Sequence, residues 1–222
     1  MVSTGLEQLD NVLGGGGYPE KSSILIAGPP GVGKEALGYW FMRSGLLAGD
    51  FCLYVTRLEV SEVLEDVKGF RIPMDKLPVW MASSGAKLRC DINDLVSVSS
   101  TIKETLRQNT SGRARVVTDI LSSLLMLNST DTIYRFFGQL LSESKQRNAV
   151  FVATIEEGMH QQQTLAAMEQ LFDGVLELRL YEEGSRVEPL FRVRKMRGVE
   201  PRPGYFRYEF LQGKMEISAY VK

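Results

Sequence analysis

The residues from Gly28 to Lys34 have the types and the spacing of a loop that binds phosphate groups. The loop reads Gly28-Pro29-Pro30-Gly31-Val32-Gly33-Lys34 and fits the pattern G-x-x-x-x-G-K. Glycines let the backbone turn so that successive N–H groups face an anion, and a lysine adds a compact positive charge for the outer phosphates. Together with the two residues that follow, Glu35 and Ala36, this loop predicts a nucleotide site.

Two carboxylates are candidates for holding Mg²⁺ beside the phosphates. Glu35 follows the lysine directly, at a position where such loops usually supply a Ser or Thr hydroxyl to Mg²⁺. Glu35 either binds the metal in place of that hydroxyl or points away and stabilises the first turn of a helix. Asp119 ends an apolar run, as the second metal-binding acid of P-loop proteins does, although such an Asp also commonly caps a helix. We predict Asp119 and Glu35 as metal ligands, with ATP and Mg²⁺ as cofactors.

Alternating strands and helices are expected to position these residues. Short apolar runs predict strands at residues 23–27, 51–56, 79–82, 114–119 and 149–154, and helical periodicity predicts helices at 34–48, 60–70, 91–108 and 130–147. From residue 174 the sequence is rich in strands, expected at 174–181, 189–195 and 204–211. This order predicts an α/β fold in one domain, residues 1–222, with a mostly parallel twisted sheet flanked by helices and a C-terminal antiparallel extension.

The composition is that of an ordinary globular protein. The chain has 222 residues, of which 44% are hydrophobic and 24% charged, enough for one substantial core. A formal net charge of −1 provides no overall attraction to DNA or to an anionic membrane, so such contacts would need a local patch. Cys52 and Cys90 lack metal-type spacing, and no apolar run is long enough to cross a bilayer. We therefore expect a cytoplasmic protein without a membrane partner.

The order of motifs resembles the KaiC-like ATPases of the RecA/RadA superfamily over nearly the whole chain. The likeness rests, besides the phosphate loop, on Ser3-Thr4-Gly5-Leu6, Leu13-Gly14-Gly15-Gly16, Val55-Thr56-Arg57-Leu58-Glu59 and Lys195-Met196-Arg197-Gly198. This resemblance implies a RecA-type P-loop NTPase core that binds ATP or ADP at residues 28–34 and supports the metal through Asp119. It also implies a homo-oligomer, with a hexameric ring as one arrangement.

The resemblance further implies a role for Lys195 and Arg197. Members of the superfamily commonly place the nucleotide between protomers, so both side chains would reach the γ-phosphate of a neighbouring subunit and stabilise charge on the transferred group. Two alternatives stay open for the basic residues of this region. They either solvate an exposed strand face, or form a nucleic-acid patch with Tyr205 and Phe206 available for stacking.

This sequence departs from the family pattern at the position that activates water. The first glutamate of the family's pair aligns with Leu58, which accepts no proton, and Glu59 is left as the catalytic candidate. Adjacent strand residues point to opposite faces, so Glu59 replaces its neighbour only where the strand ends or bulges. Thr154 is the candidate for sensing the γ-phosphate. With Glu35 and Leu58 both altered, we expect nucleotide binding with weak or absent hydrolysis.

The leading hypothesis is an ATP-binding KaiC-like protein with a nucleotide-dependent role in regulation or assembly. Its partners would be copies of itself or a regulatory protein, and any ATPase activity, yielding ADP and phosphate, would be weak. The alternative, motivated by the basic residues at 192–207, is a RadA-paralogue-like accessory ATPase that binds DNA in recombination or repair. Two further hypotheses are a competent ATPase that uses Glu35 and Glu59 in the missing roles, and a scaffold with a vestigial loop.

Overall fold

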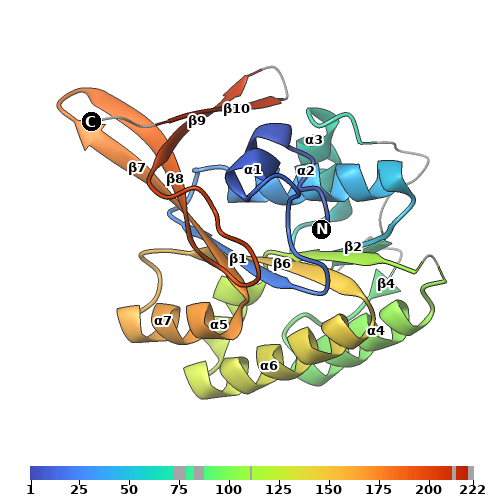
Figure 1. Ribbon diagram of the computed structural model, residues 1–222. Helices are drawn as coiled ribbons and strands as arrows, with labels where there is room; N and C mark the ends of the chain where they lie inside the picture. Colours follow the sequence, from blue (N-terminus) through green and yellow to red (C-terminus); the bar gives the residue numbers. More distant parts are fainter. Residues whose placement is uncertain (73–78, 83–87, 111, 212–213, 220–222) are drawn as a thin grey trace.

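The strands of the computed structural model, which describes residues 1–72, 79–82, 88–110, 112–211 and 214–219, form one ten-stranded sheet (Figure 1). In sheet order the strands are β10 (Lys214–Ala219), β9 (Phe206–Leu211), β8 (Arg186–Met196), β7 (Gly174–Glu183), β1 (Ser23–Gly28), β6 (Ala149–Glu156), β5 (Ala114–Thr118), β2 (Phe51–Val55), β3 (Val79–Ala82) and β4 (Leu88–Arg89). Neighbours from β7 to β4 pair in parallel, and those from β7 to β10 pair antiparallel. The predicted fold class is confirmed, with the difference that β7 still belongs to the parallel part.

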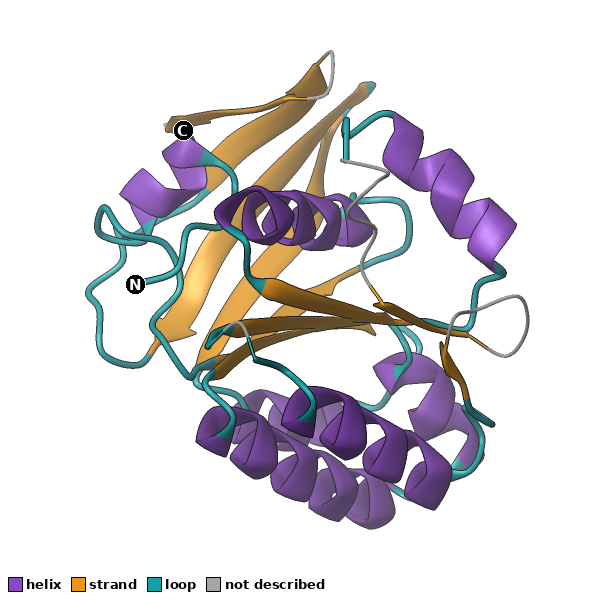
Figure 2. Ribbon diagram, turned by 90° about the vertical axis from the view of Figure 1, so that its right-hand side faces the viewer, coloured by secondary structure: helices purple, strands orange, loops and turns teal. Residues whose placement is uncertain are grey.

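Helices cover both faces of the sheet and close one core on each side (Figures 1 and 2). One face carries α1 (Glu7–Val12), α2 (Lys34–Ala48) and α3 (Val60–Lys68), and the other carries α4 (Leu95–Arg107), α5 (Leu121–Leu127), α6 (Thr130–Gln146) and α7 (Gln162–Leu171). Successive strand residues alternate between the two cores: Ile24 and Ile26 pack on the α2 side, and Leu25 packs on the α6 side. Burial on both faces explains why β1 reads as an unbroken apolar run.

The carboxyl ends of the parallel strands meet at one edge of the sheet, which is where such folds bind ligands. β1 ends at Gly28, β6 ends at Glu156 and β5 ends at Thr118, so the phosphate loop and Asp119 follow the two strands that flank β6, and all three strands end at this edge. The strand β6 is two residues longer than predicted. The elements α1, α5, α7, β4 and β10 are additional to the predicted ones.

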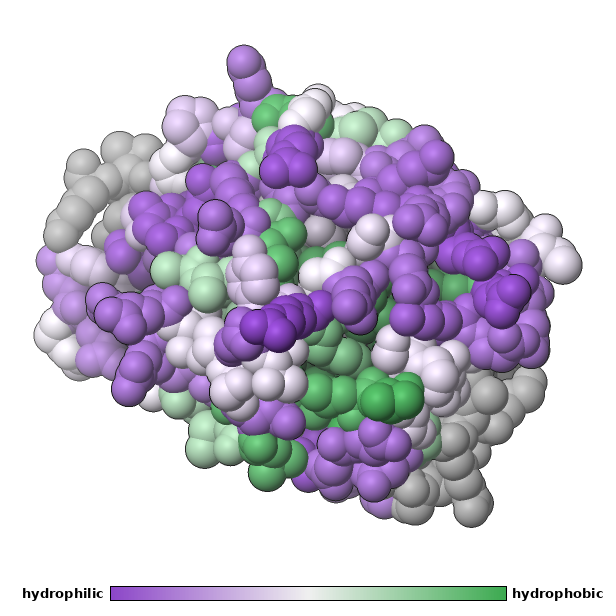
Figure 3. Space-filling view, turned by 90° about the horizontal axis from the view of Figure 1, so that it is seen from below, coloured by the Kyte–Doolittle hydropathy of each residue, from purple (hydrophilic) through white to green (hydrophobic). Residues whose placement is uncertain are grey.

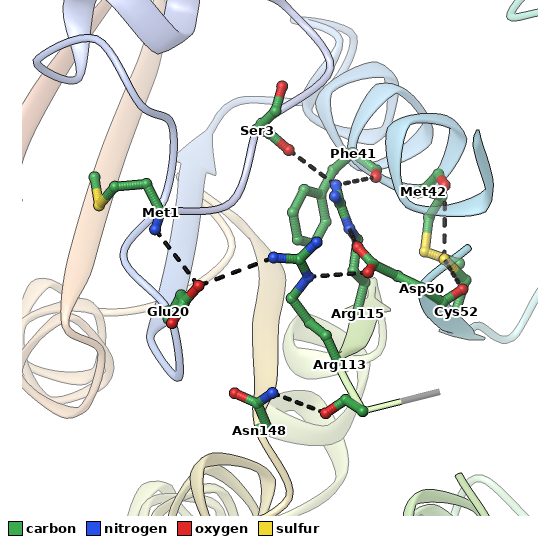
Figure 4. A network of polar contacts seen from close by, with 11 residues as sticks. Met1, Ser3, Glu20, Phe41, Met42, Asp50, Cys52, Arg113, Arg115 and Asn148 are labelled. Carbon is green, nitrogen blue, oxygen red and sulfur yellow. Dashed lines mark hydrogen bonds and ion pairs between the residues drawn. The ribbon is translucent and has the colours of Figure 1, made fainter. Parts of the chain in front are cut away.

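A buried arginine ties α2 to β5 at the opposite edge of the sheet (Figure 4). The Arg115 side chain is 2% exposed and donates to Asp50 Oδ2 (2.8 Å), the Ser3 carbonyl (2.8 Å) and the Phe41 carbonyl (2.9 Å). Its guanidinium lies 4.6 Å from the centre of the Phe41 ring. A Cβ atom on Gly45 would lie 2.5 Å from the Arg115 Cδ atom, so the approach of α2 requires glycine there. This network sets the position of the helix that begins at the phosphate loop.

The layer formed by α4, α5, α6 and α7 presents a mostly hydrophilic outer surface with apolar patches (Figure 3). Exposed apolar side chains on or beside these helices include Val96 of α4 and Met126 and Leu127 at the end of α5. Among the described residues, no helix has the length and apolar character needed to span a bilayer.

Candidate nucleotide site

The predicted phosphate loop joins β1 to α2, which is the context that this motif requires. Gly31 (φ 79°) and Gly33 (φ 83°) adopt left-handed conformations that favour glycine, and Gly33 occupies the N-cap position of α2. Among the described residues, no side chain caps this helix start. The first backbone N–H groups of α2, with the positive end of its dipole, are therefore oriented to bind an anion.

The strand β9 packs directly against the phosphate loop, a contact that the sequence did not indicate. The Tyr208 hydroxyl donates a hydrogen bond to the Val32 carbonyl (2.5 Å). A Cβ atom on Gly33 would lie 2.5 Å from the Phe210 ring, so the ring covers this glycine closely. The antiparallel extension therefore supports the loop conformation. Tyr208 and Phe210 lie more than 170 positions after the loop, and no local pattern links them to it.

The side chain of Lys34 is fully buried and paired within the chain. Its ammonium group donates to the Pro29 carbonyl (2.7 Å) and forms an ion pair with Glu156 Oε2 (2.9 Å). The backbone N–H of Glu156 donates to the Ser122 hydroxyl (2.8 Å), which fixes the end of β6. Thr154, expected as the sensor, is buried two residues earlier on this strand. Glu156 is thus the β6 side chain that contacts Lys34, and sequence reasoning missed it.

Asp119 follows β5 at the same edge, and two side chains of the neighbouring strand region orient it. The Tyr54 hydroxyl (2.9 Å) and the Thr56 hydroxyl (2.7 Å) both donate to Asp119 Oδ2. Burial raises the pKa of Asp119 to about 6; these two hydrogen bonds oppose the increase, and the negative charge of Glu35 adds to it. The two predicted metal ligands therefore lie close enough to interact electrostatically.

The oxygen donors of Asp119 and Glu35 suit a hard cation such as Mg²⁺, which is usually held by one or two carboxylates together with phosphate oxygens. Within the described ranges, His, Cys, Asp and Glu side chains form no group of three or more that would hold a metal. Glu35 is half-buried in the first turn of α2, where its charge also suits the helix dipole. The local geometry is therefore compatible with both interpretations of Glu35. The remaining predicted loop residues line the turn, with Pro30 exposed and Ala36 half-buried.

The position expected to activate water has an apolar side chain, and the next carboxylate caps a helix. Leu58 is half-buried against the core on the α2 face. Glu59 is the N-cap of α3, and its side chain accepts a hydrogen bond from the backbone of Glu62 in a capping box. The strand β2 ends at Val55, so Glu59 lies beyond it, as its candidate role requires. The catalytic assignment of Glu59 remains a prediction.

Lys195 and Arg197 lie near the edge of the sheet opposite their own phosphate loop. Lys195 pairs in register with Val175, which in turn pairs with Leu25 near the start of β1. Arg197 is 78% exposed and forms an ion pair with Asp173 (3.1 Å). Partial burial, and then the charge of Arg197, lower the pKa of Lys195. Lys195 and Arg197 thus lie away from the phosphate loop of their own chain. That they contact the nucleotide of a neighbouring subunit stays a prediction.

Three further basic residues of the C-terminal strands are paired with acids. The pairs are Arg192 with Glu177 (2.7 Å), Arg194 with Glu169 (2.5 Å) and Arg207 with Glu188 (2.8 Å). Tyr205 stacks against guanidinium groups, with the Arg179 group 3.9 Å and the Arg192 group 4.8 Å from its ring centre. This region is consequently a network of opposite charges and not a uniformly positive patch.

A phosphate loop between β1 and α2, with an acid after the parallel strand β5, which β6 separates from β1, defines a P-loop protein with a RecA-type core. The family model described as "ATPase: KaiC" matches residues 2–220 of this chain. The chain therefore belongs to the KaiC family of ATPases, which confirms the resemblance inferred from its motifs.

Individual relatives agree with this assignment. "Circadian clock protein KaiC2" of Synechocystis sp. is 26% identical over 208 residues, which cover 89% of this chain and 35% of that protein. A UPF0273 protein of Pyrococcus furiosus is 26% identical over 221 residues, covering 89% of this chain and 85% of the relative. "DNA repair protein RadA" of Haemophilus influenzae is 38% identical over 93 residues, which cover 41% of this chain and 20% of that protein. The chain thus spans about a third of KaiC2 and most of the Pyrococcus protein.

Proposed function

We propose that residues 1–222 act as one nucleotide-responsive regulatory domain that binds ATP or ADP in the cytoplasm. The observation that carries this proposal is the complete phosphate cradle, with left-handed Gly31 and Gly33 at the start of α2 and with Lys34 beside them. The nucleotide state would control self-assembly, with a hexameric ring as one form, or contact with a protein partner.

In this proposal Asp119 and Glu35 hold Mg²⁺ next to the outer phosphates. The ion would supply positive charge that offsets the phosphates and the two carboxylates. Tyr54 and Thr56 keep the Asp119 carboxylate in place through its Oδ2 atom. The contribution of the chain would therefore be two carboxylate ligands, Glu35 in the first turn of α2 and Asp119 after β5.

Hydrolysis is proposed to be weak or absent. Leu58 provides no acceptor for a proton from water, and the Glu59 carboxylate is used in capping α3. Any residual turnover would depend on Glu59, with Lys195 and Arg197 of an adjacent protomer supplying positive charge to the γ-phosphate. Their location away from the loop of their own chain supports this arrangement between subunits.

Binding is tested by ligand-induced thermal stabilisation with ADP or ATP in excess Mg²⁺. At a ligand concentration of 100 Kd, binding contributes about 2.7 kcal/mol of stability. For a chain of this size, this energy raises Tm by roughly 5–10 °C. Lys34→Ala should abolish the shift, and Lys68→Ala, on exposed α3, is the matched control and should retain it. The absence of any shift in the wild type would favour a vestigial loop.

Hydrolysis is tested by phosphate release under multiple turnover. We expect a rate well below the roughly 1–1000 s⁻¹ typical of enzymes, and an increase when Leu58→Glu is combined with Glu35→Thr. Wild-type turnover within that range, with no gain in the double variant, would instead support a competent ATPase using Glu35 and Glu59.

DNA binding is the second candidate function, and the partial similarity to a RadA protein motivates it. The ion pairs of Arg192, Arg194 and Arg207 argue against it because their charges are already compensated. A DNA titration at low salt distinguishes the two functions. Affinity that falls steeply with salt, and is lost on charge reversal of Lys195 and Arg197, would establish the DNA-binding alternative.

A further inference from the structure

The positive charge that should receive phosphate is already neutralised by a carboxylate of the same chain. Lys34 is 0% exposed, and within the described part of the chain its ammonium group contacts the Pro29 carbonyl and Glu156 Oε2. Glu156 is 24% exposed and is therefore the partner that a ligand from solvent reaches first. An incoming phosphate group can bind the Lys34 ammonium group only if it shares this group with the Glu156 carboxylate or displaces the carboxylate.

We expect Glu156 to meet the outer phosphate of a bound nucleotide and not the inner ones. The loop backbone and the start of α2 receive the inner phosphates, since their N–H groups converge there. A further phosphate must then extend toward the ends of the neighbouring parallel strands β5 and β6, where Asp119 and Glu156 are located. The Glu156 carboxylate, 2.9 Å from the Lys34 ammonium group, already occupies the positive charge on which we expect the outer phosphate to depend.

Backbone contacts hold Glu156 in this position. Its Cα pairs in register with Gly28 at the start of the loop, and its backbone N–H donates to the Ser122 hydroxyl (2.8 Å). The next residue, Glu157, donates its N–H to the Gly28 carbonyl (3.0 Å). The backbone at the end of β6 is thus held by both β1 and α5, so we expect an entering phosphate to displace the Glu156 side chain and not this backbone.

We propose that Glu156 makes this site selective for nucleoside diphosphates over triphosphates. The inference rests on the proposed function, in that a nucleotide must bind the loop. A diphosphate shares Lys34 with Glu156, because an ammonium group has three donors. A triphosphate also brings the negative charge of its γ-phosphate toward the Glu156 carboxylate, and like charges in a partly buried site repel strongly.

The test is calorimetric titration of the full chain with ADP and with ATP, each in excess Mg²⁺. The wild type should bind ADP at least tenfold more tightly than ATP. Glu156→Gln removes the charge at constant size, and it should reduce the ratio of the ATP Kd to the ADP Kd by about tenfold, which corresponds to 1.4 kcal/mol. Glu157→Gln removes the neighbouring charge as a matched control and should leave this ratio near the wild-type value.

The outcomes separate this inference from the proposed function. If neither nucleotide binds the wild type, the proposed function itself fails. If both bind and the wild type prefers ATP or shows no preference, the selectivity proposal is overturned, whether or not any variant folds. A ratio that is unchanged in both Glu156→Gln and Glu156→Ala, each checked for a native melting transition, also overturns it. A ratio that shifts equally in Glu157→Gln would assign the effect to general charge and reject the role of Glu156.

Discussion

The buried carboxyl of Asp119 should make the stability of the protein depend on pH in a way that Asp119→Asn removes. Burial raises the pKa of this group from 3.8 to about 6, with the charge of Glu35 adding to the shift. Asparagine retains an oxygen that accepts the hydrogen bonds of Tyr54 and Thr56 and lacks only the titration. The variant therefore isolates the free energy of ionising one side chain.

The direction of this pH dependence follows from the pKa of Asp119 in the folded and in the unfolded protein. The unfolded carboxyl loses its proton near pH 3.8, whereas the folded one holds it until about pH 6. The protonated Asp119 carboxyl thus contributes fully to the free energy of unfolding below about pH 4, and this contribution is lost as the pH rises through 6. A shift of about 2 pKa units, at 1.36 kcal/mol per unit, makes this loss about 3 kcal/mol.

The assay is urea unfolding without nucleotide at several values from about pH 4 to pH 7. Groups common to both proteins cancel in the difference, so Asp119→Asn should gain about 3 kcal/mol relative to the wild type across this range. Asp131→Asn, at a 68% exposed position on α6, should change little. A difference between the Asp119 variant and the wild type that stays within about 0.5 kcal/mol at every pH, or moves in the opposite direction, would refute the reasoning.

Two further predictions concern the supports of the site. Arg115→Met should destabilise the protein by about 3 kcal/mol in urea unfolding, because it leaves the Asp50 carboxylate short of one buried partner, while the ADP affinity of the folded protein stays the same. A loss below about 1 kcal/mol would show that this network is not stabilising. Tyr208→Phe removes the hydrogen bond to the Val32 carbonyl and should weaken ADP binding about three- to tenfold by calorimetry, as expected for a lost bond of about 1 kcal/mol. Unchanged affinity would mean that β9 does not support the loop conformation.

Local patterns in the sequence predict the phosphate loop and most of the surrounding elements. The helix at 34–48 and the strand at 79–82 agree with the structure at both ends. The reason is that glycine conformations, helical periodicity and apolar strand runs depend on residues close together in the chain. The same patterns missed α5 and α7, which are short helices, and ended β6 two residues early.

That error at β6 concealed the contact with the greatest consequence for the site. Thr154 and Glu156 lie on the same face of one strand, and only the strand's true end decides which of them stands beside the lysine. Lys34 and Glu156 are 122 positions apart, and no local spacing reports their pairing.

The sequence by itself determined which reactive groups the chain carries: the glycines and lysine of a phosphate loop, two acids that we predict as metal ligands, and an apolar Leu58 where a proton acceptor was expected. Tertiary structure alone decided which charges meet. Parallel pairing of β1 with β6 brings Glu156 next to Lys34, and the packing of β9 against the phosphate loop brings the Tyr208 hydroxyl to the Val32 carbonyl. The physical reason is that the interaction of two charges, or of a donor and an acceptor, depends on their distance in space and on burial. Both are set by the packing of the whole sheet.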